Sequence, residues 1–153
     1  MDTKEYSLLE KEICARLPYN LKVQYKLPNY QTNEFDTEEG IAFCVNLGMG
    51  LVDIHGGGID YNISIHKVKP MLRPMSDMTE EEQEEYDKLC HHFVQLYAES
   101  PWEHKDNYFY DLKAFEWLNK HQLDYNGLIE MGLAVKIENK IKENRTITDN
   151  KEI

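Results

Sequence analysis

The sequence of 153 residues lacks the features of membrane-spanning and disulfide-bonded secreted chains. No stretch approaches the roughly 20 apolar residues that a helix needs to cross a bilayer. The first residues, Met1 to Glu5, are rich in charge and lead into no apolar segment, so we expect no signal peptide and a cytoplasmic location. Cys14, Cys44 and Cys90 are widely spaced with no Cys-x-x-Cys pair. We expect them to be small buried hydrophobic residues in a reducing compartment.

Positive charge is also scarce, with 17 Lys and Arg against 28 Asp and Glu and a net charge of −11. Because phosphate contacts depend on Lys and Arg, this balance disfavours direct binding of nucleic acid. It suits a soluble chain with a solvated acidic surface, a chain with a basic partner, or one whose surface imitates DNA. No membrane partner is expected.

Complete catalytic and metal-binding motifs are absent too. The run His55 to Gly58 matches the oxyanion-hole motif of some lipases, but the Gly-x-Ser-x-Gly nucleophile turn is missing, so the glycines predict a tight turn instead. His91 and His92 fall in a predicted helix, where neighbours point about 100° apart and do not easily share a metal. Cys90 lies on the apolar stripe of that helix, so we expect it to pack. We predict no catalytic residue, no metal ligand and no cofactor.

What is present is the apolar periodicity of an α+β fold. Leu9, Ile13 and Leu17 recur at helical spacing and predict a helix over 3–17, ended by Pro18. Alternation of apolar and polar residues predicts strands separated by short turns, and this pattern indicates an antiparallel meander or small half-barrel of about four strands. The predicted strands are 21–27, 41–47, 51–54 and 61–66, the last continuing toward Pro70, with a loop over 28–40 and a turn at 56–58.

The second half of the sequence predicts two or three helices packed against that sheet. Thr79 to Glu82 forms a capping box at the start of a helix that runs to Ala98. Ser100-Pro101 should end this helix, and a linker with Trp102 and Tyr108 to Tyr110 should follow. Asp111 is expected to cap a helix over 112–121. Asn126 is expected to cap a short helix over 127–131 that ends at Gly132, before a last strand over 133–137. One domain over 1–137 and a polar tail over 138–153 are expected.

The segment Val68 to Met78 is the least usual, because Pro70 and Pro74 exclude both a helix interior and a central strand. We expect an extended strap with its apolar side chains inward. Arg73 lies between apolar residues, so its guanidinium should have a fixed acceptor, either a carboxylate or helix-end carbonyls. The alternative is that Lys69 and Arg73 bind an anionic ligand.

The start of the acidic helix carries seven carboxylates between Asp77 and Asp87. The pattern favours a solvated face, with docking of a basic partner as the second interpretation.

Three segments carry a resemblance to known sequences: Leu17 to Val23, the motif Val-Lys-Pro-x-Leu-Arg-Pro-x-Ser-Asp-x-Thr over 68–79, and Phe115 to Leu118 followed by the motif Asp-Tyr-x-Gly-Leu-Ile-x-x-Gly-Leu-Ala over 124–134. These segments resemble an uncharacterised protein family of gut Bacteroidetes and their phages. Together they cover roughly a quarter to a third of the chain. The resemblance implies a phage or prophage origin, and it brings no catalytic residue, ligand or activity with it.

Three functions remain open from the sequence. The first is a phage-type binding protein for a host protein or small ligand, which modulates a host process such as defence, with Lys69, Arg73 and His55 as ligand-binding candidates. The second is a small hydrolase or nucleotide-processing enzyme around Asp53, His55 and Asp60. It requires these side chains to converge in a pocket. The third is a homo-oligomeric structural or assembly factor.

Overall fold

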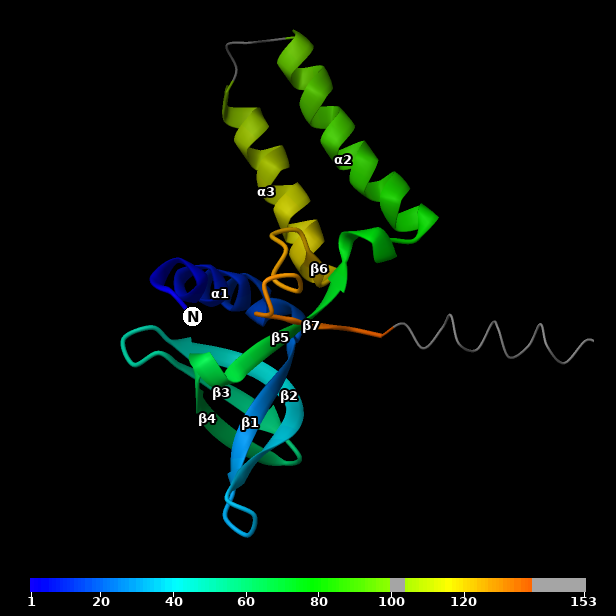
Figure 1. Ribbon diagram of the computed structural model, residues 1–153. Coiled ribbons are helices and arrows are strands. Elements are labelled where there is room, and N and C mark those ends of the chain that lie inside the picture. The colour runs from blue at the N-terminus through cyan, green and yellow to red at the C-terminus, as the bar shows by residue number, and fades with distance from the viewer. Residues whose placement is uncertain (100–103, 139–153) are drawn as a thin grey trace, which may run out of the picture.

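The computed structural model describes residues 1–99 and 104–138, with side chains for residues 1–90 and 112–138. The chain forms an N-terminal helix, an antiparallel-rich sheet and two further helices, which confirms the predicted α+β class (Figure 1). The helices are α1 (Thr3–Arg16), α2 (Glu80–Glu99) and α3 (His104–Lys120). The strands are β1 (Lys22–Asn29), β2 (Glu34–Asn46), β3 (Leu51–Gly56), β4 (Ile59–Ser64), β5 (Val68–Pro74), β6 (Leu123–Asp124) and β7 (Val135–Lys136). The predicted stop at Ser100-Pro101, Trp102 and the tail over 139–153 lie outside the described residues.

Helix α1 forms where its periodicity predicts it. Asp2 and Glu5 make a reciprocal capping box at its start, and the helix ends at Arg16, followed by a single 3₁₀ turn that contains Pro18. Leu9 and Ile13 are fully buried against the sheet. Both residues belong to the hydrophobic core, so α1 covers one face of the sheet.

The sheet has the order β4-β3-β2-β1-β5-β6, and β1 to β4 form the predicted antiparallel meander. The expectation that the fourth strand continues to Pro70 is wrong. A 3₁₀ turn over Ile65–Lys67 separates β4 from β5, and it lets β5 cross to the other side of the meander and pair with β1. Both β6 and β7 then pair in parallel with β5.

The loop predicted over 28–40 is wrong, because most of it is a β-hairpin. β1 continues to Asn29, and β2 begins at Glu34 after a tight turn in which Asn33 adopts a left-handed φ of 57°. Asn29 donates from its Nδ2 to Asp36 across the two strands, 2.9 Å away. β5 pairs only with the inner part of β1, so the outer part of this hairpin projects from the sheet (Figure 1). Residues 31–39 are all exposed, and they show no apolar alternation for that reason.

Helices α2 and α3 form a hairpin that extends away from the sheet (Figure 1). The predicted capping box is present: Glu82 N donates to Thr79 Oγ1 at 3.1 Å, and Thr79 N donates to Glu82 Oε2 at 3.0 Å. The linker predicted at Tyr108–Tyr110 and the cap predicted at Asp111 are wrong, because α3 already begins at His104. The sequence from His104 to Lys120 contains no Pro or Gly, so nothing interrupts the helix at Asp111.

The segment after α3 is a series of turns and not the predicted short helix over 127–131. Asp124 stabilises these turns, because its carboxylate accepts hydrogen bonds from Leu128 N at 2.8 Å and Ile129 N at 2.9 Å. Asn126, the predicted cap, instead donates to Glu12 on α1. The predicted left-handed terminator is confirmed, since Gly132 has a φ of 74°. The predicted last strand is present as β7.

The core lies between α1 and the inner face of the sheet. The prediction of buried cysteines is wrong for Cys44, which is exposed because it follows a bulge between Ala42 and Cys44 in β2; Cys14 and Cys90 are half-buried. In the part of the chain that the structure describes, no helix combines the length and the apolar character needed to cross a membrane.

Candidate anion-binding site

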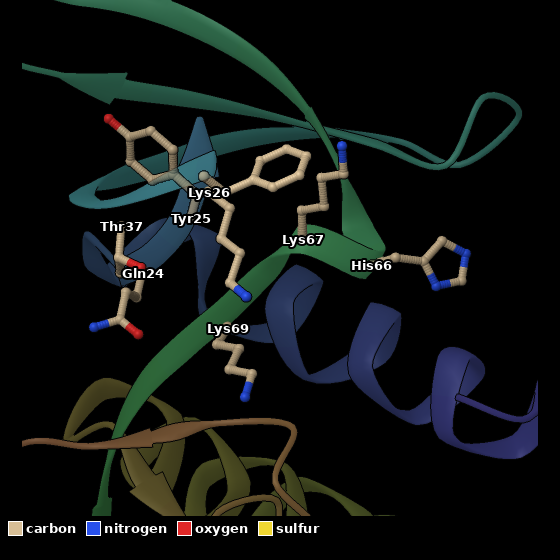
Figure 2. Close-up of a pocket in the computed structure, with 8 residues that line it drawn as sticks. Gln24, Tyr25, Lys26, Thr37, His66, Lys67 and Lys69 are labelled. Atoms are coloured by element: carbon tan, nitrogen blue, oxygen red, sulfur yellow. The ribbon is translucent and has the colours of Figure 1, made fainter. Parts of the chain in front are cut away.

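A cavity of about 340 Å³ lies where β5 leaves β1, at the base of the projecting hairpin. It collects residues from β1, β2, the 3₁₀ turn and β5 (Figure 2). The lining residues are Gln24, Tyr25, Lys26, Phe35, Thr37, His66, Lys67 and Lys69. In a chain with a net charge of −11, this lining contains three lysines and no carboxylate.

Strand register brings these side chains together. Lys26 lies opposite Thr37 of β2, and Gln24 lies opposite Lys69 of β5. Alternation along β1 buries Val23 and Tyr25 and turns Gln24 and Lys26 to the outer face. In Figure 2 the ammonium of Lys26 extends toward β5, the strand that carries Lys69. A lysine of β1 and two lysines that come more than forty positions later, in the 3₁₀ turn and β5, therefore line one cavity.

Within the described residues, no carboxylate forms an ion pair with these lysines. The ion pairs among the described residues are Arg16–Glu12, His55–Asp60 and Arg73–Glu82, none of which includes a lysine of the cavity. Lys67 Nζ lies 4.7 Å from the centroid of the Phe35 ring, a cation–π contact. His66 packs against Tyr6 of α1, with 5.1 Å between ring centroids. The cavity therefore holds positive charge that a bound anion would neutralise.

Tyr25 contributes to the wall of the cavity, but its hydroxyl points away from the lysines (Figure 2). Burial raises the pKa of this hydroxyl, and Tyr61 and Glu38 raise it further. The hydroxyl therefore stays protonated at neutral pH and adds no negative charge near the lysines.

Of the three residues proposed from the sequence, only Lys69 lies at this cavity. Arg73 binds Glu82 through both terminal nitrogens, at 3.0 and 2.8 Å, and donates to the carbonyls of Asp77 at 3.0 Å and His121 at 3.4 Å. This confirms that its guanidinium has fixed acceptors, a carboxylate and helix-end carbonyls. The hydrogen bond to Glu82 raises the pKa of Arg73, so its charge is permanent.

His55 lies on the β3–β4 hairpin, away from the lysines. Its Nδ1 lies 2.6 Å from the Asp60 carboxylate, and the two side chains are 60% and 68% exposed. Asp53 lies nearby and accepts a hydrogen bond from Asn62. These residues share one face of an exposed hairpin and none of them lines the lysine cavity, so the arrangement gives the hydrolase hypothesis no support.

Sequence reasoning missed Lys26, Lys67 and Phe35. The strand pattern over 21–27 places Gln24 and Lys26 on its polar face, and this was the available signal. The pairing of β1 with β5 joins residues more than forty positions apart, and the sequence pattern gives no hint of it. Among the described residues, no group of three or more His, Cys, Asp or Glu is arranged to hold a metal ion.

Comparison of the chain with family models, curated proteins and solved structures finds no match. The geometry of the cavity is therefore the basis for the functional proposal.

Proposed function

We propose that this chain is a binding protein that holds a small anionic ligand in the lysine-lined cavity. The observation that carries the proposal is that one cavity of an otherwise acidic protein is lined by Lys26, Lys67 and Lys69, none of them ion-paired within the described residues. Like charges gathered without counter-charges cost stability, and such costs are typical of sites kept for function. Of the two target classes open from the sequence, the cavity favours a small ligand over a host protein.

The size and chemistry of the cavity support a binding role. Its volume lies near the lower end of the roughly 300–1,000 Å³ found for small-molecule sites. Catalysis by a hydroxyl or thiol nucleophile would need a base within hydrogen-bonding distance. Among the described residues of the lining, no hydrogen bond joins the hydroxyl of Thr37 or Tyr25 to His66.

The resemblance to a family of gut Bacteroidetes and their phages supports a wider form of the proposal. In this form the chain works in the cytoplasm of a host cell and modulates a host process, such as defence, by withdrawing an anionic ligand. The permanent charge of an anion would keep such a ligand inside the cell, where a cytoplasmic binder meets it.

Isothermal titration calorimetry with inorganic pyrophosphate as the probe tests the proposal. The wild-type chain should bind it with a Kd below about 1 mM, and raising the salt concentration should weaken the binding by screening. Lys69→Gln should weaken binding by about tenfold. Lys88→Gln removes the same charge from α2, outside the cavity, and should leave the affinity unchanged. Equal losses in both variants, or no binding by the wild type, would contradict the proposal.

A further inference from the structure

The lysine-lined cavity also contains an exposed aromatic ring, which narrows the class of ligand. Phe35 lies on β2 opposite Pro28, and its side chain is 52% exposed. A phenylalanine on a strand gains stability by burying its ring, but Phe35 stays half exposed even with Lys67 in contact with its ring, so part of the ring is free to contact a ligand. Aromatic rings at such places bind the faces of planar groups, including nucleobases.

The cation nearest to this ring is Lys67, with its Nζ 4.7 Å from the ring centroid. A ligand that stacks on Phe35 and carries its negative charge a few ångströms away would meet Lys67, with Lys26 and Lys69 further along the cavity. The cavity thus offers an aromatic surface and a cationic wall side by side. This arrangement matches a molecule with a planar ring at one end and a phosphate at the other.

Two neutral polar side chains complete the lining. Gln24 and Thr37 lie on β1 and β2, and neither side chain forms a hydrogen bond within the described residues. The amide of Gln24 offers both donors and an acceptor, and the hydroxyl of Thr37 offers one of each. Such groups can pair with the edge of a base or with ribose hydroxyls, whereas a simple inorganic anion would leave the amide acceptor unused.

We propose that the ligand is a single nucleotide, with its phosphates among Lys26, Lys67 and Lys69 and its base against Phe35. This inference rests on the proposed anion-binding function and specifies its ligand class. A cavity of about 340 Å³ suits one nucleotide rather than a length of polynucleotide. The net charge of −11 opposes a long polyanion in the same way.

Calorimetric titration of the full chain tests the inference with three kinds of probe: the common nucleoside mono- and diphosphates, ribose 5-phosphate, and inorganic pyrophosphate. At least one nucleotide should bind about tenfold or more tightly than ribose 5-phosphate, because only the nucleotide carries a base that stacks on the ring of Phe35. Phe35→Leu should remove most of this advantage and leave the affinity for pyrophosphate unchanged. Lys69→Gln should weaken the binding of all three kinds of probe.

Phe43→Leu is the matched control, because Phe43 is 50% exposed on the same strand and lies outside the cavity. It should bind nucleotides like the wild type, and thermal melts of both Phe variants should show that the fold is retained. If ribose 5-phosphate binds as tightly as every nucleotide, the nucleotide inference fails while the anion site stands. If no probe binds, the proposed function itself fails. Binding of a single-stranded oligonucleotide without binding of mononucleotides would overturn the inference in favour of a polynucleotide.

Discussion

Arg16 is the residue on which the packing of α1 depends most directly. Its side chain is fully buried and forms an ion pair with Glu12, and its Nη2 donates to the carbonyl of Leu123 at 2.7 Å. One side chain therefore links the first helix to β6 near the other end of the chain. Arg16→Met should leave the Glu12 carboxylate buried without its cation, and we expect a loss of about 3–5 kcal/mol in the free energy of unfolding, measured with urea.

The double variant Glu12→Gln/Arg16→Met is the control for this prediction. It removes both charges, and it also removes the Nε of Arg16, which has no hydrogen-bond partner among the described residues. It should be more stable than the single variant Arg16→Met, because no uncompensated charge stays buried. If both variants lose the same stability, the contribution of Arg16 is packing rather than charge.

The Arg73–Glu82 pair makes the stability of the fold depend on pH in the acidic range. The hydrogen bond from Arg73 lowers the pKa of Glu82 below its ordinary value of 4.5, partly opposed by burial and assisted by the amide of Thr79. A lowered pKa in the folded state means that the pair stabilises the fold above the unfolded pKa. This stability is lost as the pH falls through the folded pKa. Melting temperatures should therefore fall below about pH 4.5, and Glu82→Gln should reduce that dependence while lowering stability at neutral pH.

Glu80→Gln is the comparison variant for the pH series. Glu80 is exposed in the same first turn of α2, and the carboxylate that binds Arg73 is that of Glu82. Its melting temperatures should fall with acid as those of the wild type do. An unchanged acid response in Glu82→Gln would show that other carboxylates dominate it.

At the scale of elements, the close contact between β2 and β3 depends on Gly40. A Cβ at this position would lie 2.6 Å from the carbonyl oxygen of His55 and 2.8 Å from the Ile54 side chain. Backbone atoms give way little, so Gly40→Ala should destabilise the chain by about 1–3 kcal/mol in urea unfolding. Gly48→Ala is the control, because its Cβ would meet only the Asn46 side chain at 3.7 Å. Equal stability of the two variants would contradict the assigned contact.

Elements with one buried face were predictable from the sequence, and elements without one were not. α1 and the inner part of β1 each bury alternate or periodic apolar residues, so their patterns indicate them. The start of β2 is exposed on both faces and is held by pairing with β1, so no hydrophobic period indicates it. The cavity follows the same rule: Lys69 is notable in the sequence because it lies beside Pro70, and Lys67 is two residues before it, but Lys26 joins them only through the pairing of β5 with β1.

At the scale of the whole molecule, the distribution of charge predicts opposite effects on stability when a lysine is removed outside the cavity and when one is removed inside it. With a net charge of −11, the carboxylates of the folded chain repel one another, so removing a lysine should normally destabilise the fold further. Lys88 illustrates this, because it lies on α2 among carboxylates, four residues after Glu84. Lys88→Gln should lower the melting temperature slightly at low salt.

In the cavity the repulsion between lysines should outweigh the attraction of nearby carboxylates such as Glu39, which lies opposite Gln24, because none of the described carboxylates forms an ion pair with a lysine of the cavity. Lys26→Gln should therefore raise the stability of the unliganded chain, by up to about 0.5 kcal/mol, although it makes the net charge more negative. Thermal melts at about 20 mM and about 200 mM NaCl test this, since screening should shrink the difference between the variants. If Lys26→Gln destabilises the chain as Lys88→Gln does, the lysines of the cavity do not repel one another, and their grouping in one cavity would no longer support an anion-binding site.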